Sequence, residues 1–388
     1  MAETADVVVI GLGAVGSATL YRLARAGAKV VGIDRYHPPH AMGSSHGESR
    51  ITRLAVGEGG DYAPLVRRSH AIWRELESET GEALMLQTGG LIMGPSSGAA
   101  HHHGKDDFVR RSIRVARESG VAVEALDAAE ITARFPQFIL QGDEIACYEP
   151  TAGLLFPERC IDVQLRLAAR HGATMHLGER VLDMRTIEGG MEVVTDRRSI
   201  QAGRIVLSAG PWLPALAGSL TPFTQVYRQT LHWFAADETA FAPDRFPVFI
   251  WMHGEHEEDY FYGLPSQPGS GSVKVASERY ADAVNPETVS RDVSLTESDE
   301  MFTRHVSGRL RSMRPAVLRS AACLYTVTPD AGFILDILPE HFNVIAASAC
   351  SGHGFKHSAA IGERLAAQAM GTVAQHSRNF ALERLVRG

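Results

Sequence analysis

Two arginines three positions apart are the first candidates for chemistry in this 388-residue sequence. Arg50 and Arg53 lie in "ESRITR", directly after the Gly/Ser/His-rich stretch "AMGSSHG". If this segment forms a helical turn, the spacing places both guanidiniums on one face. The planar guanidinium matches a carboxylate with two parallel hydrogen bonds, so the pair could hold an acidic ligand. The alternative is a solvated basic face, which is common for arginines.

Two lysines stand in sequence contexts that also favour a functional role. Lys356, in "GHGFKHS", lies at the start of a predicted helix, where free N–H groups and a partial positive charge attract anions. A surface lysine at an ordinary helix start is the alternative. Lys274 is flanked by Val273 and Val275, and strand alternation places it on the face opposite the valines. An isolated strand lysine usually faces solvent.

The four cysteines are Cys147, Cys160, Cys323 and Cys350, and their spacing does not match a metal site. They suit a reducing compartment better than a disulfide framework. Cys323 opens the stretch "CLYTVTPD". A nearby cation would favour its thiolate, which is the nucleophilic form. A buried free cysteine is the alternative and the commonest role for a lone thiol.

A histidine triplet, residues 101–103, lies in the polar stretch "SSGAAHHHGKDD". Such a Gly/Ser-rich composition predicts a mobile surface loop. A metal site is the alternative interpretation, and we predict no metal for this protein.

The N-terminal segment predicts a strand, a tight turn, a helix and a second strand. Residues 7–10 are a β-branched run, as in a buried parallel strand. Gly11, Gly13 and Gly16 form G-x-G-x-x-G, and Asp34 follows 23 positions after Gly11, where an acidic ribose ligand belongs. The pattern predicts dinucleotide binding. The alternative is a glycine loop that serves only helix packing.

The rest of the chain predicts mixed α/β structure. Residues 63–80 and about 106–135 have helical patterns, and the loop before Arg50 is expected to lead into a short helix. "RVLDMRTIEGGMEVVTD" predicts a hairpin, and "RIVLSAGPW" predicts a strand that ends near Gly210. The C-terminal stretch from "FNVIAASAC" predicts a strand, a Gly-rich turn and a helix. The nucleotide-binding half is therefore expected to be split along the chain.

Composition excludes several classes of protein. The net charge of -7 lacks the basic footprint of a nucleic-acid-binding protein. No stretch approaches the roughly 20 apolar residues of a membrane span. The start "MAETADVVVIG" is acidic and does not resemble a secretory signal, so we expect a cytoplasmic protein.

Four stretches carry a resemblance to a known family. They are "GLGAVGSA" with "DRYHPPHAMGSSHGESRITRLAVGEG", then "YFYGLPSQPGSGSVKV", "CLYTVTPDAGFILDILP" and "SGHGFKHSAAIGE". Together they resemble the monomeric sarcosine oxidase and N-methyltryptophan oxidase family, within the glycine oxidase/D-amino acid oxidase group of flavoproteins. The first motif occurs in many dinucleotide-binding proteins, whereas the other three are specific to the group.

The resemblance implies an α/β fold with two domains. A Rossmann-like FAD-binding domain would comprise residues 1–87, 145–215 and 320–388. A sheet-rich substrate-binding domain, residues 88–144 and 216–319, would be inserted into it.

The resemblance also implies roles for individual residues. Cys323 matches a cysteine that forms a thioether with the 8α-methyl group of FAD. Arg53 and Lys356 match two ligands of the substrate carboxylate. Arg50 matches an arginine that lies against the flavin, and Lys274 matches a lysine that points at flavin N5 through a water and assists oxygen.

Further matches lie around the implied substrate pocket. His46 matches a histidine of the same loop, and Tyr262 and Tyr325 match pocket tyrosines, with core aromatics as the alternative. Glu278 departs from the pattern, because sarcosine oxidases carry a histidine four residues after the lysine that matches Lys274. The imidazole is therefore missing or supplied from elsewhere, and sarcosine is in doubt as the preferred substrate. The resemblance places the FAD-binding residues at Gly11, Gly13, Ala14, Val15, Gly16, Asp34, Arg35, Gly43, Ser44, Ser45, Arg50, Val181, Gly210, Cys323, Gly352, Gly354, Phe355 and Lys356.

The implied activity is oxidation of a secondary amino acid, N-methyl or cyclic. A hydride equivalent would pass to FAD, oxygen would be reduced to hydrogen peroxide, and imine hydrolysis would release an aldehyde from N-methyl substrates. The expected partners are a small amino acid and oxygen, and the expected state is a monomer or small homo-oligomer. Three alternatives remain: an FAD-dependent dehydrogenase with a protein acceptor, an NAD-dependent dehydrogenase, and a flavin subunit of a larger oxidase complex.

Overall fold

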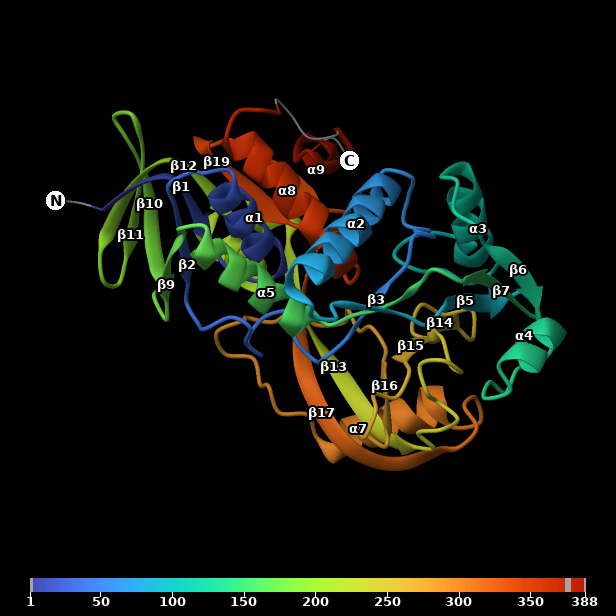
Figure 1. Cartoon of the computed structure of the whole chain (residues 1–388). Helices are drawn as coiled ribbons and strands as arrows, with labels where there is room; N and C mark the ends of the chain where they lie inside the picture. Colours follow the sequence, from blue (N-terminus) through green and yellow to red (C-terminus); the bar gives the residue numbers. More distant parts are fainter. Residues whose placement is uncertain (1–2, 374–377, 387–388) are drawn as a thin grey trace.

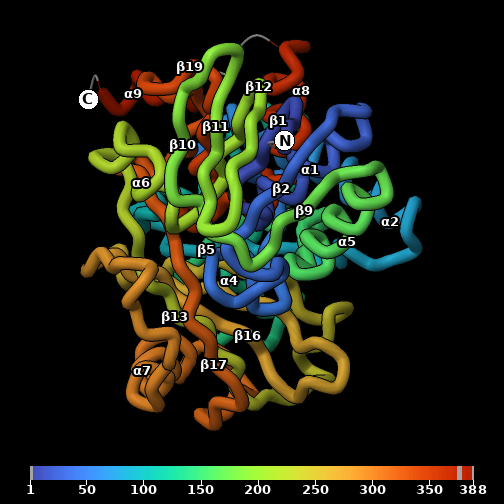
Figure 2. The backbone as a smooth tube through the Cα atoms, turned by 90° about the vertical axis from the view of Figure 1, so that its left-hand side faces the viewer, coloured from blue at the N-terminus to red at the C-terminus, as the bar shows by residue number. Residues whose placement is uncertain are grey.

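The computed structural model describes residues 3–373 and 378–386, which form two sheet-based lobes (Figure 1). Two long strands, β13 (Gln225–Ala236) and β17 (Met313–Val327), run from the first lobe along the second (Figures 1 and 2). The α/β fold class predicted from the sequence is therefore confirmed.

The first lobe is built on an eight-stranded sheet whose centre is parallel. Residues Val8 and Val9 are completely buried, because a parallel strand is covered on both faces. In spatial order the parallel strands are β9 (Thr174–Leu177), β2 (Val30–Asp34), β1 (Glu3–Ile10), β12 (Ser199–Leu207) and β19 (His341–Ser348). Antiparallel additions are the predicted hairpin β10 (Val181–Ile187) and β11 (Gly190–Thr195), beside β12, and β18 (Ile334–Leu338), beside β19.

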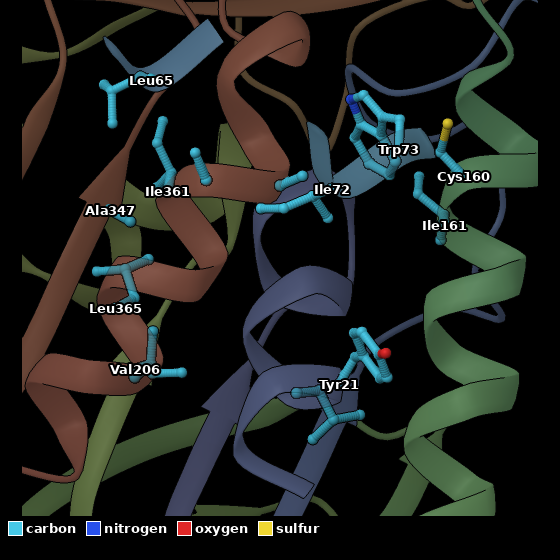
Figure 3. Packing of buried hydrophobic residues seen from close by; sticks show 14 of the residues in the cluster. Tyr21, Leu65, Ile72, Trp73, Cys160, Ile161, Val206, Ala347, Ile361 and Leu365 are labelled. Atoms are coloured by element: carbon cyan, nitrogen blue, oxygen red, sulfur yellow. The ribbon is translucent and has the colours of Figure 1, made fainter. Parts of the chain in front are cut away.

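Helices from distant parts of the chain pack together against this sheet. They are α1 (Ala14–Arg25), α2 (Tyr62–Thr80), α5 (Pro157–Arg170) and α8 (Ser358–Ala369). Figure 3 shows their shared apolar core, with Tyr21, Ile72, Ile161 and Leu365 among the contacts. A Cβ added at Gly362 would lie 2.3 Å from Cβ of Ala18, so α1 and α8 approach closely only because position 362 is glycine.

The second lobe is an eight-stranded mixed sheet with an aromatic core. In spatial order it comprises β17, β13, β16 (Ser272–Ala276), β15 (Tyr260–Leu264), β14 (Val248–Met252), β5 (Gly90–Pro95), β7 (Glu144–Glu149) and β6 (Glu124–Asp127). Phe138 stacks on Phe246 and meets Phe249 and Trp251 edge-on, and this core holds the sheet. Three helices accompany this lobe: α3 (Phe108–Glu118), α4 (Ala128–Arg134) and α7 (Leu295–Met301).

A small third sheet contains the chain around Arg50. It consists of β3 (Arg50–Thr52), β8 (Gly153–Leu155) and β4 (Met85–Gln87). The short helix expected after the Gly/Ser/His loop is therefore wrong, because this segment pairs with β8 as a strand. The helical pattern over residues 106–135 is also interrupted, since β6 separates α3 from α4.

Strand pairing bears on where the two domains divide. β7 pairs with β5 and β6 in the second sheet, although it falls within the 145–215 segment expected for the FAD-binding domain. Residues 320–327 of β17 likewise pair with β13. We propose that the dividing lines follow β7 and β17.

Short helical turns complete the described structure. They are η1 (Gly210–Trp212), α6 (Leu213–Leu216), η2 (Gly218–Phe223), η3 (Phe302–Val306), η4 (Phe355–His357), η5 (Arg378–Phe380) and α9 (Glu383–Val386). Within residues 3–373 and 378–386, no helix has both the length and the apolar character needed to cross a bilayer.

Candidate functional site

A cavity lies at the carboxyl end of the parallel strands of the first sheet, beside the glycine turn that joins β1 to α1. A Cβ at Gly11 would meet the Ser208 carbonyl oxygen at 2.6 Å, and one at Gly16 would lie 1.8 Å from the Gly11 carbonyl oxygen. Gly13 differs, because its added Cβ would meet only Ser45 Oγ, at 3.9 Å, and otherwise faces the cavity. Two glycines therefore let the backbone pack, and the third leaves room for a ligand.

Asp34 ends β2 and holds the glycine turn. Its buried carboxylate accepts hydrogen bonds from the backbone N–H groups of Leu12 and Tyr36, each at 2.8 Å. The same residue lines the cavity, beside Arg35, whose guanidinium pairs with Glu287 from the second lobe. The acidic residue predicted at this spacing is therefore in contact with both the turn and the cavity.

Cys323 lies fully buried in β17, next to Arg50. Nη2 of Arg50 donates to the Ser44 carbonyl oxygen at 2.7 Å and lies 3.6 Å from Sγ of Cys323. The Cys323 Sγ is also 3.4 Å from the Ser44 carbonyl oxygen. The Cys323 thiol therefore lies against the Arg50 guanidinium and the backbone of the Gly/Ser/His-rich loop.

Lys274 is buried, with 3% of its surface exposed, so it does not face solvent as isolated strand lysines usually do. Its Nζ donates to the carbonyl oxygens of Gly47 and Ser49, each at 2.7 Å. Burial and the nearby Arg50 charge lower the pKa of Lys274 well below its usual range. His46 belongs to the same loop, and burial together with the charges of Arg50 and Lys274 lowers its pKa to about 3, so its imidazole is neutral at physiological pH.

Two cations converge on one buried carboxylate. Nη2 of Arg53 lies 2.7 Å from Oε1 of Glu58, and Nζ of Lys356 lies 3.4 Å from the same oxygen. Burial alone would raise the pKa of Glu58, but Arg53 and Lys356 outweigh it and hold this pKa well below its usual range. Burial lowers the pKa of Lys356 to about 8, against the opposing effect of Glu58.

Arg50 and Arg53 do not share one helical face. Arg50 belongs to β3 and turns to Ser44 and Cys323, whereas Arg53 follows the strand and turns to Glu58. The chain is extended here, so the predicted same-face projection was wrong, and the two guanidiniums contact different groups.

Tyr262 and Tyr325 come together from β15 and β17. Their hydroxyl oxygens are 3.4 Å apart. Burial raises the pKa of Tyr262 to about 12, against the opposing charge of Arg50, so its hydroxyl keeps its proton at physiological pH.

The histidine triplet is only partly a surface loop. His101 is exposed and lies 2.7 Å from Asp106, but the side chains of His102 and His103 are buried. Nε2 of His103 lies 3.1 Å from Oε2 of Glu278. An imidazole is thus supplied to the position beside Glu278 from a segment 175 residues away. The predicted mobile loop was wrong for these two residues.

Comparison with known proteins identifies the family of the chain and several nearly full-length relatives. The model of the FAD dependent oxidoreductase family matches residues 6–368. Monomeric sarcosine oxidase of Bacillus sp. strain B-0618 is 35% identical over 376 residues, 96% of this chain and 93% of that one. N-methyl-L-tryptophan oxidase of Salmonella arizonae is 34% identical over 364 residues, 92% of each chain.

The chain belongs to the FAD dependent oxidoreductase family. Among solved structures, NikD, described as an unusual amino acid oxidase essential for nikkomycin biosynthesis, matches with a TM-score of 0.84. It is 24% identical, and the match covers 98% of this chain and 97% of that one. This likeness supports the fold alone.

The first cavity fits FAD, because its glycine turn and Asp34 lie at its end as a dinucleotide requires. The residues expected to bind FAD that line it are Gly11, Gly13, Ala14, Val15, Asp34, Arg35, Gly43, Ser44, Ser45, Val181 and Gly210. Those expected to bind FAD that lie outside its lining are Gly16, Arg50, Cys323, Gly352, Gly354, Phe355 and Lys356.

Sequence reasoning missed several residues that line the FAD cavity. They are Tyr36, His40, Glu179, Trp212, Glu287 and Cys350. Two of these residues could have been found from the sequence. Tyr36 directly follows the predicted Arg35, and Trp212 lies two residues after the predicted Gly210. Glu287 arrives from a loop of the second lobe, and no local signal identifies it.

Proposed function

We propose that this protein is an FAD-dependent oxidase of secondary amino acids, N-methyl or cyclic. The observation that carries the proposal is the convergence of Arg53 and Lys356 on one buried carboxylate oxygen, now that of Glu58. A site that already stabilises one carboxylate can hold that of a substrate. The sarcosine and N-methyl-L-tryptophan oxidases among the relatives are consistent with this substrate class.

Bound FAD would supply the acceptor for a hydride equivalent from the C–H beside the substrate amine, and oxygen would take up the two electrons to give hydrogen peroxide. The chain's own residues orient the substrate. Arg53 and Lys356 bind its carboxylate and thereby set the direction of the reacting C–H. The Glu58 carboxylate moves partly away from these two cations when the substrate binds. Tyr325, which is buried, and Tyr262, which is partly buried, would wall the pocket on the side of the second sheet. Hydrolysis of the imine product releases an aldehyde when the N-substituent is methyl.

The proposal includes a thioether between Cys323 and FAD. It is supported by the burial of Sγ and by the Arg50 guanidinium 3.6 Å from it. Cys350, which lines the FAD cavity, is the competing thiol. After acid denaturation, yellow colour should remain with the polypeptide in the parent and in Cys350→Ala, and should be lost from Cys323→Ala. Colour retained by Cys323→Ala contradicts the assignment.

Oxygen as electron acceptor is part of the same proposal. Lys274 is held by two carbonyl oxygens, so its ammonium has a fixed position from which it can stabilise negative charge as oxygen accepts electrons. The alternative is a dehydrogenase that uses a protein acceptor, in which Lys274 only binds the Gly47–Ser49 loop. The two hydrogen bonds from Lys274 to backbone carbonyl oxygens of this loop favour the second function, because they give the lysine a structural role that does not involve oxygen. Oxygen consumption in the steady state separates the two.

A peroxide-coupled screen of purified, FAD-loaded protein against secondary amino acids tests the function. The panel should contain N-methyl amino acids with small and large side chains and the cyclic imino acids proline and pipecolate. We expect peroxide from at least one of them and none from the matching primary amino acid. Absence of both peroxide and anaerobic flavin bleaching across the panel contradicts the proposal.

A further inference from the structure

A second cavity, of about 190 Å³, reaches the carboxylate-binding site from a different side. Glu58 and His103 both line it, together with Lys105, Asp330 and Arg384. Three buried polar atoms around Glu58 have no hydrogen-bond partner among the described residues: Oε2 of Glu58 and Nδ1 of both His103 and His353. Charged and polar side chains therefore line a cavity beside Glu58 that shares no lining residue with the FAD cavity.

His103 reaches this place through a tight turn. His102 and Lys105 exchange two backbone hydrogen bonds, at 3.1 and 3.0 Å, and the two residues between them have positive φ, 50° for His103 and 66° for Gly104. Such values at both central positions are typical of a type I′ turn. A histidine in this uncommon conformation points to a functional constraint on its side chain.

Glu278 is held from two sides, and one of its oxygens remains available. Oε2 lies 3.1 Å from Nε2 of His103 and accepts a hydrogen bond from the Tyr280 hydroxyl at 2.8 Å. Oε1 faces Gly352, where an added Cβ would lie only 2.8 Å from it. The carboxylate side chain is 6% exposed, so it is a buried charge that depends on its neighbours.

The charges around this pair come from several elements. Burial disfavours a charged His103, but Glu278 and Glu58 outweigh this effect and raise the pKa of His103 to about 9. The titratable groups that face Glu278 are Tyr260, Tyr262, Tyr280, Tyr325, His103 and Lys356. Those that face His103 are Glu58, Glu278, His102 and His353.

We propose that Glu278 and His103 accept the proton of the substrate ammonium group and pass it to the second cavity. The inference rests on the proposed function, because an amine must lose this proton before it can give up a hydride equivalent. The amino group is one carbon away from the carboxylate that Arg53 and Lys356 would hold. Nδ1 of His103 lies only 3.8 Å from the oxygen that now occupies this place, Oε1 of Glu58.

Each proton transfer in this sequence has one donor atom and one acceptor. The N–H bond of the ammonium breaks and an O–H bond forms at Oε1 of Glu278. Glu278 holds this proton while the flavin is reduced. The imidazolium of His103 then releases its Nδ1 proton to water in the second cavity and keeps the proton on Nε2. The pair, now a carboxylic acid and a neutral imidazole, carries as many protons as at the start, and one proton has left the site. Proton exchange with water restores the carboxylate and the imidazolium before the next turnover.

A metal site is the competing assignment for these residues. Ligand atoms of His102, His103 and Glu278 lie within 4.8 Å of one another. However, His103 already bonds Glu278, and His102 is stacked between the rings of His103 and Tyr260. These contacts account for the arrangement through protein groups alone, so we assign it to proton transfer.

The test is anaerobic flavin reduction measured against pH with the best secondary amino acid. In the FAD-loaded parent we expect a rate at low substrate concentration that changes little across neutral pH. In Glu278→Gln only the free amine reacts, so the same rate should fall about tenfold per pH unit below the pKa of the substrate amine. His103→Gln should show the same steep profile, and Glu278→Asp should restore the flat one. Glu257→Gln, an exposed charge change in the same lobe, is the control.

The outcomes separate the two levels of the proposal. A flat profile in both Glu278→Gln and His103→Gln overturns the proton transfer and leaves the proposed function intact. A steep profile already present in the parent also overturns it. If the parent shows no flavin reduction with any secondary amino acid, both proposals fail. If Glu278→Gln does not fold, His103→Gln decides the question.

Discussion

The glycine turn after β1 and the pocket around Glu58 differ in how far apart in the sequence their parts lie. The turn and the acid that holds it fall within residues 7–34 and belong to one β-α-β unit. The pocket joins Arg53, Glu58, Lys356 and the Glu278–His103 pair, which come from four distant segments. The turn is fixed by backbone packing, and the pocket by long-range pairing of buried charges. Substitutions in the turn should therefore affect FAD binding and folding, whereas substitutions in the pocket should affect the substrate and its reaction.

The largest effect is expected from Gly16→Ala. Its new methyl group would lie 1.8 Å from the Gly11 carbonyl oxygen, which is backbone and cannot move aside without opening the turn. We expect loss of FAD and of stable folding, measured by flavin absorbance per polypeptide and by thermal unfolding. Gly13→Ala is the matched variant, since its methyl group would face the cavity. It should lose FAD but unfold like the FAD-free parent. A Gly16→Ala protein with full FAD content contradicts the role of this packing.

Lys274→Met should separate the two halves of the reaction. The variant removes a cation held by Gly47 and Ser49 but leaves Arg53 and Lys356 in place. Anaerobic flavin reduction should change little, while reoxidation by oxygen should slow by orders of magnitude, since about 1.4 kcal/mol of lost anion stabilisation is tenfold in rate. Stopped-flow measurement of both steps checks this, with exposed Lys29→Met as control. Unchanged reoxidation would revive the dehydrogenase interpretation.

Arg53→Met should weaken substrate binding without removing FAD. A lost charge-assisted pair costs about 2–4 kcal/mol, roughly 30- to 1000-fold in KM. The exposed Arg185→Met is a matched control and should keep the parental KM. FAD content serves as the second readout, because Arg53 does not line the FAD cavity. A parental KM in Arg53→Met would sink the assignment of the carboxylate site.

A smaller effect is expected from pH on the binding of a simple carboxylate. The pKa of Lys356 is lowered to about 8, so its ammonium is present below that pH and is lost as pH rises through it. Acetate, which has no amine to titrate, should bind more weakly by several-fold above about pH 8 than at pH 7, as followed by perturbation of the flavin spectrum. In Lys356→Met this pH dependence should disappear. An equal dependence in parent and variant assigns it to another group.

The same contrast explains what could be predicted from sequence. The β1–α1–β2 unit and α2 were predicted correctly because the periodicity of apolar residues and the spacing of glycines are local features of the sequence. Arg50 was misplaced on a helix because pairing of β3 with β8 is a long-range event. His103 was interpreted as a surface residue because "HHHGK" is polar. The glycine at position 104 could have indicated a tight two-residue turn with His103 as its first central residue. No sequence pattern pointed to Glu58, because its role depends on Arg53 and Lys356, which approach it only in the folded chain.

Recognition of the substrate carboxylate is tested most directly by changing the substrate rather than the protein. Anaerobic flavin reduction should be compared for the best secondary amino acid and for the amide of the same compound, at equal concentrations of free amine. Arg53 and Lys356 can form charge-assisted bonds only with the acid. We expect rapid bleaching of the flavin by the acid and at least tenfold slower bleaching by the amide. Equal rates for the two compounds would contradict a carboxylate-anchored mechanism.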